Sequence, residues 1–394
     1  MINVETNYFS INKLLLRTLG LWPYQQSNLT RFQFIFLSTI LTTHVIFQFT
    51  VFFSQRCTPD LITKVLSSGI LFALFVIKYD MFFVNIKAVK DLLEQLLDIY
   101  NELKDGNEIA IINEYGCYAI RSTISLLVFG ISSLILCIFA SFWSDILDII
   151  LPTNESRSHN FLVMTEYFID QKKYFYFIIL HFILSFSIAT IVTVSVGTML
   201  LTYLQHTCGL FKIASYRIER AMNISLLQNI NEMKCIFIHE GLICAVDMHR
   251  QAMNLSTCLI SSFESMLFCL LVCGVLTMSI NLFQIFQIMS FEGNIKECFL
   301  PSLFVFVVGL YMFLANYIAQ TITNHNEHVF TTVYNVKWYL APLCIQRMIL
   351  FLLQKNYKNF TLSVGGLFNG SIETFATLVK TSVSYFTVLY STQQ

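Results

Sequence analysis

Seven apolar stretches, each long enough to cross a lipid bilayer as a helix, constrain this chain more than any other feature. They lie at residues 32–53, 61–83, 122–144, 174–204, 258–291, 299–322 and 371–391. A helix of about 20 apolar residues crosses about 30 Å of hydrocarbon. Only 12% of the residues are charged, whereas about 25% is usual in soluble domains. We therefore predict an all-α membrane protein with seven transmembrane helices.

The positions of Lys and Arg predict how these helices are oriented. When the seven stretches cross alternately, 17 of the 24 Lys and Arg residues, Lys78 among them, fall on the side of the N-terminus. Six fall on the opposite side, and Lys380 lies within the last stretch. Because cytoplasmic loops are enriched in positive charge, we predict a cytosolic N-terminus and an extracellular C-terminus.

The connections on the predicted cytosolic side are long and have a helical pattern of their own. In 208–257, apolar residues recur mostly every three to five positions, as in helices with one apolar face. They include Leu210, Ile213, Met233, Ile236 and Ile243. We predict that 205–257 and 323–370 form an intracellular helical domain. Since no Gly-rich or Pro-rich linker and no repeat divides the chain, residues 1–394 are predicted to form a single domain.

The sequence offers little for catalysis, metal binding or nucleic-acid binding. Lys+Arg and Asp+Glu balance at 24 each, so the chain lacks the excess of positive charge that binds the phosphates of nucleic acid. His239-Glu240 lacks the second His of a metalloprotease helix, and His325 and His328 have no further ligand nearby in the sequence. We predict no enzymatic activity, no cofactor and no metal site.

The eleven cysteines are scattered, without CxxC pairs or the regular spacing of a disulfide framework. We interpret most of them as small apolar residues. Cys57 and Cys298 both lie near the predicted outer surface, where an oxidising environment permits a disulfide. A bond between these two residues and a pair of unconnected thiols both remain open.

The last apolar stretch carries a stripe of mostly hydroxyl-bearing residues. Its members recur at alternating steps of three and four positions, which places them on one face of a helix. They are Thr374, Thr377, Thr381, Ser384, Val388 and Ser391. Such a face can line a water-filled ion pathway, with Val388 as an apolar constriction, if several subunits each contribute one helix. A Ser/Thr face that hydrogen-bonds to a neighbouring helix explains the stripe equally well.

Aromatic residues are abundant in the other apolar stretches and are interleaved with a few polar ones. Together they could line an apolar cavity for a small uncharged organic ligand, in the outer half of spans two, three, four and six. The candidate ligand contacts are Phe72, Phe75, Ser133, Cys137, Ile179, His181, Phe182, Phe304 and Tyr311. Packing within the core and contact with lipid explain most of these residues equally well.

Several motifs near the C-terminus have a distinctive sequence. They are VYNVKWY at 333–339, Arg347, FTLSVGGLFNGSIETF at 360–375 and TSVSYFTVL at 381–389. With weaker matches at LGLWP (19–23) and His239, this tail resembles that of the insect odorant receptors. The likeness extends over the whole chain in length and in the order of its apolar stretches.

The resemblance implies a tuning subunit of an odorant-gated, non-selective cation channel, in which an odorant co-receptor completes a heterotetramer. Such a subunit detects a volatile or cuticular organic compound in the plasma membrane of olfactory sensory neurons. The family's last helix lines one central pore, and the preceding helix belongs to an intracellular anchor. The gate positions of the family fall on Val388 and Thr392. Thr392 replaces the usual Leu, and 205–257 lacks the long insertion of the co-receptor, so the resemblance favours a tuning subunit.

Two alternative classes of receptor remain. A G-protein-coupled receptor would need the opposite orientation, and none of the five Pro residues follows Asn, so the Asn-Pro signature of the commonest seventh helix is missing. A gustatory-type receptor would share the fold and the pore but form homotetramers. Current from the chain expressed alone would favour this homomeric class.

Glycosylation tests the predicted orientation. Asn154-Glu155-Ser156 is the only N-x-S/T sequon that this topology places outside the cell. We expect a glycan that glycosidase treatment removes and that Asn154→Gln abolishes, measured as a shift in electrophoretic mobility. An unmodified Asn154 together with a glycan at Asn28 would overturn the orientation.

Overall fold

The computed structural model describes residues 8–143, 162–171, 173–223, 232–292, 297–355 and 360–391. These residues are almost entirely helical, which confirms the all-α prediction. Six helical segments among them are long and apolar enough to cross a membrane: Asn28–Ser54, Pro59–Val84, Gly106–Ser141, Phe175–Ala221, Glu264–Ser290 and Phe299–Asn335. Each of them overlaps one of the first six predicted spans. Asn154 and Thr392 lie outside the described residues.

The described helices and strands follow one another along the chain in this order. The first half of the chain forms α2 (Ser10–Thr18), α3 (Asn28–Phe49), α4 (Val51–Ser54), α5 (Pro59–Val84), α6 (Ile86–Glu102), α7 (Gly106–Ser141) and α9 (Phe175–Ala221). The second half forms α11 (Glu232–Ser262), α12 (Glu264–Gln287), a π-helical turn (Ile288–Glu292), α13 (Phe299–Asn335), a 3-10 turn (Trp338–Leu340) and α14 (Leu343–Lys355). The hairpin of β1 (Ser363–Val364) and β2 (Phe368–Asn369) then leads into α15 (Ile372–Ser391).

Local capping explains where several helices begin. The Thr58 hydroxyl accepts a hydrogen bond from the backbone N–H of Leu61, and Pro59 occupies the first turn of α5. Ser27 and Thr30 form a reciprocal capping box at the start of α3. These side chains satisfy N–H groups that have no partner within the helix.

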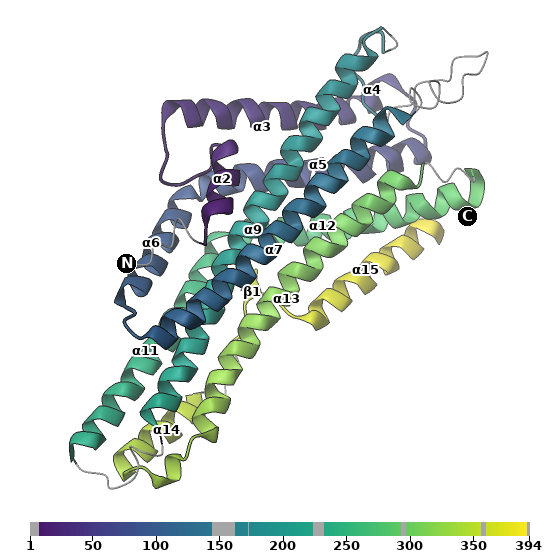
Figure 1. Ribbon diagram of the computed structural model, residues 1–394. Coiled ribbons are helices and arrows are strands. Elements are labelled where there is room, and N and C mark those ends of the chain that lie inside the picture. Colours follow the sequence, from purple (N-terminus) through teal and green to yellow (C-terminus); the bar gives the residue numbers. More distant parts are fainter. Residues whose placement is uncertain are drawn as a thin grey trace.

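Long helices give the molecule its elongated shape (Figure 1). α9 packs along α7, α11 and α13, and α12 packs between α5, α13 and α15. The 47 residues of α9 correspond to about 70 Å at 1.5 Å per residue, more than twice the thickness of the hydrocarbon layer. The lower part of Figure 1, where α9, α11 and α13 reach α14, corresponds to the predicted intracellular domain.

The helical extensions bury only part of the apolar pattern read from the sequence. Leu210 and Ile213 of α9 are fully buried. Met233, Ile236 and Ile243 of α11 are exposed. The reason is that α11 packs on α9 through its opposite face, which leaves a second apolar surface uncovered.

The fifth predicted span is not one continuous helix. α11 ends at Ser262, and α12 begins at Glu264. The Glu264 carboxylate accepts a hydrogen bond from the backbone N–H of Gly365 at 2.9 Å. Gly365 and Gly366 form the hairpin turn with φ of +64° each, a conformation that glycine adopts without strain. Glu264 therefore ties the start of α12 to the hairpin that precedes α15.

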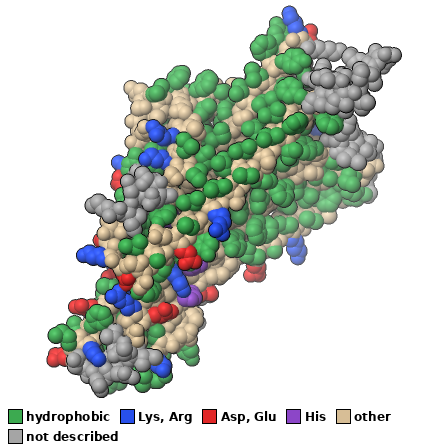
Figure 2. All heavy atoms as spheres, in the orientation of Figure 1, with side chains coloured by type: hydrophobic (Ala, Val, Ile, Leu, Met, Phe, Trp, Pro, Cys, Tyr) green, Lys and Arg blue, Asp and Glu red, His purple; other side chains and the backbone are tan. Residues whose placement is uncertain are grey.

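The predicted seventh span corresponds to α15. Its 20 residues suffice to cross the hydrocarbon layer, and the helix packs against α12 and α13. α15 is not one of the six segments named above as long and apolar enough to cross a membrane. The reason is that its Ser, Thr and charged residues lower its mean hydropathy. Hydrophobic side chains cover the broad middle of the face shown in Figure 2, over α7 and α12, while most charges gather toward its lower end.

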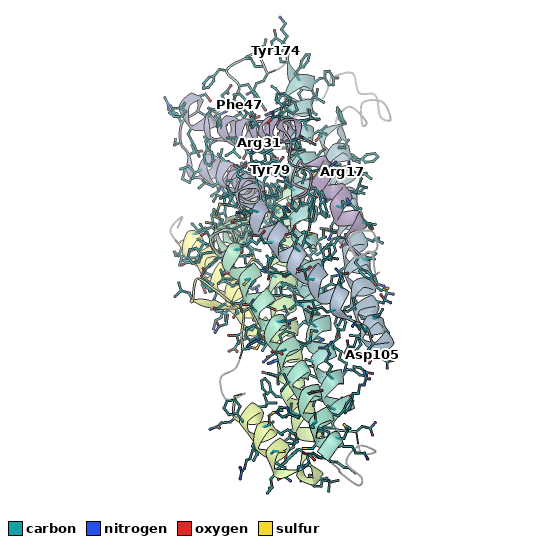
Figure 3. All side chains as sticks on the ribbon, turned by 90° about the vertical axis from the view of Figure 1, so that its left-hand side faces the viewer. Arg17, Arg31, Phe47, Tyr79, Asp105 and Tyr174 are labelled. Atoms are coloured by element: carbon teal, nitrogen blue, oxygen red, sulfur yellow. The ribbon has the colours of Figure 1, made fainter. Side chains whose placement is uncertain are left out.

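A cluster of charges joins the start of α7 to the end of α9. The Arg217 guanidinium donates to both carboxylate oxygens of Glu108, at 2.7 and 2.9 Å. Asp105 accepts from Arg220, Tyr216 and the backbone N–H of Asn107. The Asn107 hydrogen bond is the main cause that lowers the pKa of Asp105. Figure 3 places Asp105 far along the molecule from Tyr174, which precedes α9.

Removing the Glu108 carboxylate should destabilise this junction. Glu108 and Arg217 side chains are only 6% and 22% exposed, and an unpaired buried charge costs about 3 kcal/mol or more. We expect Glu108→Gln to lower the free energy of unfolding by about 3 kcal/mol, measured by denaturation of the purified protein. Glu94→Gln is the control, because the Lys90–Glu94 pair is exposed and is worth less than about 1 kcal/mol. Equal effects of the two variants would contradict this role.

Candidate ligand cavity and the last helix

A cavity of about 220 Å³ lies between the long helices. Its walls come from α5, α7, α9, α11, α12 and α13, together with the β1–β2 hairpin. Most of the lining is apolar, and its largest side chains are aromatic. They include Phe75, Phe129, Phe186, Phe263, Phe304 and Phe368. A concave and mostly apolar space of this kind suits a small organic molecule.

A few hydroxyl groups interrupt the apolar lining. Ser133 and Thr190 donate to the backbone carbonyls of Gly130 and Phe186, both at 2.8 Å, and their oxygens can still accept. Thr193 also lines the cavity, and its hydroxyl is buried without a hydrogen-bond partner among the described residues. The cavity therefore combines an apolar body with a small number of polar contacts.

Lys78 lies behind one wall of the cavity. Its ammonium nitrogen is 3.6 Å from the centroid of the Tyr311 ring, which lines the cavity. The negative face of the ring stabilises the cation. Lys78 is only 3% exposed and lies within α5, so it is buried in the second span and does not lie in a connection between helices. Sequence reasoning missed this contact, although a Lys inside an apolar stretch was an available signal.

The cavity reaches farther toward the hairpin than the sequence predicts. Besides the four predicted spans, its lining includes Leu267, Leu270 and Leu271 of α12, and Val364 of the hairpin. These residues lie at the end of α12 where Glu264 contacts the hairpin turn. The space therefore extends from the middle of the bundle to this junction and is not confined to the predicted outer half.

Hydrogen bonds connect the cavity wall to the first turn of α15. Asn316 of α13 lines the cavity and accepts from the backbone N–H of Ser371 at 3.3 Å. Thr374 also lines the cavity, and its hydroxyl donates to the Asn369 carbonyl at 2.6 Å. A change in the shape of the cavity at this end would act directly on the base of α15.

The hydroxyl stripe of α15 lies mostly on an uncovered face. Thr377, Ser384, Val388 and Ser391 are exposed, and Thr381 is half-buried. Val388, the predicted constriction, is 56% exposed. The opposite face buries Leu378 and Ser382. The Thr377 and Thr381 hydroxyls donate to carbonyls one turn earlier, so their free lone pairs can meet water or ions.

Comparison with known proteins decides the family. A family model described as 7tm Odorant receptor matches residues 58–383. The chain belongs to the odorant receptor family. Among solved structures, the insect olfactory receptor OR5 from Machilis hrabei is similar, with a TM-score of 0.72 and 15% identity over 98% of this chain and 97% of that one. The same receptor in complex with eugenol gives the same values, with 98% of each chain covered. No curated protein matches the sequence.

The structure brings four of the nine predicted contacts of this odorant receptor to the cavity. Phe75, Ser133, Phe304 and Tyr311 line it. Phe72 is buried behind Phe75, with its ring 5.7 Å away, and Cys137 is buried one turn beyond Ser133 on α7. The remaining three candidates, Ile179, His181 and Phe182, lie nearer the start of α9.

Two of these three candidates line a second, much smaller space. Ile179 and Phe182 line a pocket of about 10 Å³ together with His44, room for about one water molecule. His181 is not in its lining; its ring nitrogens lie 2.7 Å from the Tyr167 hydroxyl and 3.3 Å from the Thr43 hydroxyl. Both ring nitrogens of His44 are buried and have no partner among the described residues. This pocket is too small for an organic ligand.

The arrangement of ionisable side chains matches no metal centre within the described ranges. They contain no group of three or more His, Cys, Asp or Glu side chains that could hold a metal ion. His325 contacts Tyr115 at 2.6 Å, and His328 contacts Ser215 at 3.3 Å, so both histidines join helices. Cys57 and Cys298 are free thiols, as in the second of the two alternatives considered.

Proposed function

We propose that this chain is the odorant-binding subunit of a heteromeric, ligand-gated, non-selective cation channel. The observation that carries the proposal is the continuity between an apolar cavity and the helix with the hydroxyl stripe. The cavity lining includes Asn316 and Thr374, which hydrogen-bond at the base of α15. Family membership supports the receptor role, and the proposal assigns the chain no catalytic activity.

The cavity supports a ligand with an apolar body and one or two polar atoms. Aromatic and aliphatic side chains provide most of the contact surface, while Ser133, Thr193 and Tyr311 provide polar contacts. Complementarity of this kind favours a volatile or cuticular organic compound over an ion or a peptide. The likeness in fold to a receptor whose structure is in complex with eugenol supports the same class of ligand.

Gating follows from a difference in affinity between two states. A ligand shifts the equilibrium only if it binds the open state more tightly than the closed state. Here the ligand would contact the hairpin end of the cavity, and the hairpin would transmit the change to α15. Thr377, Thr381, Ser384 and Ser391 would line the pore, with Val388 and Thr392 at the gate.

One such helix cannot enclose a pore, so the proposal requires further subunits. Exposed apolar side chains on α14 provide a surface for them: Leu343 is 70% exposed, and Leu350 and Phe351 are exposed as well. Exposed apolar surface of this kind marks contacts between proteins. We propose that α14 and the exposed face of α11 form the intracellular anchor, with the odorant co-receptor as the partner in the plasma membrane of olfactory sensory neurons.

A paired substitution on α7 tests the cavity. Ser133→Phe should fill part of the space and raise the ligand concentration for half-maximal current by at least about tenfold, the effect of about 1.4 kcal/mol. Ser132→Phe is the matched control, because Ser132 is the neighbouring residue and is exposed. Current would be recorded with the co-receptor present over a panel of odorants. Equal shifts for both variants would contradict the assignment of the cavity.

A second experiment tests the pore and the subunit composition. We expect ligand-evoked cation current only when the chain is expressed with the co-receptor; current from the chain alone would favour the homomeric class. In the co-expressed pair, Thr381→Cys and Ser384→Cys should make the current sensitive to thiol reagents. Phe386→Cys is the control, because the Phe386 ring packs against Phe286 at 5.8 Å. Insensitivity at all three positions would contradict the pore assignment.

A further inference from the structure

Two cysteines far apart in the sequence lie side by side in the domain formed by the helical extensions. Cys235 lies in the first turns of α11, and Cys344 lies at the start of α14. Their sulfur atoms are 3.6 Å apart. Cys344 is exposed, and Cys235 is half-buried, so small molecules in solution can reach the pair in the single chain. The pair lies outside both the cavity and the hydroxyl stripe.

No other pair of cysteine sulfurs within the described ranges is joined by a hydrogen bond. Cys137 and Cys208 are buried within the bundle, while Cys117 and Cys244 are exposed and single. Proximity matters because a disulfide needs its two sulfurs to approach to about 2.05 Å. From 3.6 Å, small rotations of two side chains at the surface can close that distance.

The two thiols are not equivalent. The contact with Cys344 is the main cause that raises the pKa of the Cys235 thiol, and either sulfur can be the hydrogen-bond donor. Cys344 is the more exposed of the two. Since thiol oxidation requires access of the oxidant to the sulfur, Cys344 is the sulfur placed to react first.

We propose that Cys235 and Cys344 form a redox-sensitive pair that a hydroperoxide converts into a disulfide between α11 and α14. The Cys344 thiolate attacks a peroxide oxygen, the O–O bond breaks, and a sulfenic acid and an alcohol or water result. The Cys235 sulfur then attacks the Cys344 sulfur, the S–O bond breaks, and water leaves. In sum, two thiols lose two protons and two electrons, which the peroxide takes up. A dithiol reductant reverses the change by exchange.

The proposed bond would connect the two helices that lead into the centre of the fold. α11 continues past Phe263 into α12, and α14 leads through the hairpin into α15. α12 and α15 pack against each other. A bond between Cys235 and Cys344 would close this path into a ring and restrain α14 on α11. The restraint would exist whatever ligand the cavity takes.

Peptide mapping of the full-length protein in membranes tests the proposal directly. After treatment with hydrogen peroxide and alkylation of the remaining thiols, we expect a disulfide-linked peptide pair containing Cys235 and Cys344. Dithiothreitol should remove it. Cys235→Ser and Cys344→Ser should each abolish the linked pair, whereas Cys117→Ser, a change at a single exposed thiol, should leave it intact. Alkylation of both residues at undiminished rates after peroxide would overturn the proposal.

Thermal unfolding tests whether the bond restrains the helices. The disulfide should raise the melting temperature of the purified protein by at least about 2 °C relative to the reduced form. Cys344→Ser should melt at the temperature of the reduced wild type under both conditions, which also shows that the variant folds. A linked peptide pair without any change in melting temperature would overturn the proposed restraint. Neither measurement depends on the channel function, so its failure and that of the proposed function are distinguishable.

Discussion

In hydrocarbon no water is present to complete a hydrogen bond, and this constraint governs most of the structure. Every backbone N–H and C=O group must find a hydrogen-bond partner within the protein. A transmembrane helix meets this requirement within its own segment, and this chain crosses the hydrocarbon layer with helices. Several hydroxyl residues obey the same rule. Thr190, Ser195 and Thr207 of α9 donate to the carbonyls of residues four positions earlier. Their polar groups are satisfied locally, and apolar helices can therefore carry them toward a cavity or a pore.

The same constraint explains what the sequence predicts well. Length and hydropathy alone place the first six spans, since a chain can cross the bilayer only with long apolar segments. The sixth span is predicted from residue 299, where α13 begins, and the last from 371, one residue before α15. Steps of three and four residues place the stripe of α15 on one face, and four of its members are exposed.

Contacts between residues far apart in the sequence cannot be predicted from length, hydropathy and periodicity. In lipid both faces of a helix are apolar, so periodicity does not separate a residue that faces lipid from one that lines a cavity. Phe177 is exposed and Phe182 is buried, although both are aromatic residues of the same span. Lys78 and Tyr311, like Cys235 and Cys344, meet only through the fold. The helix breaks before Glu264, and the hairpin contributes to the cavity wall. Both features depend on how the helices pack, and no local sequence pattern predicts them.

The buried hydroxyl of Thr193 has no hydrogen-bond partner among the described residues, which has a consequence for selectivity. A buried hydroxyl without a partner raises the free energy of the empty site by about 1–3 kcal/mol. If the Thr193 side chain turns toward the cavity, a guest with a suitably placed oxygen pairs with this hydroxyl, whereas a hydrocarbon of the same shape leaves it unpaired. The receptor would thus bind the guest with the oxygen roughly five- to 150-fold more tightly than the hydrocarbon, because only that guest satisfies the buried hydroxyl. The discrimination comes from one hydrogen bond to a group that is already buried in the unliganded protein, while the apolar contacts are the same for both guests.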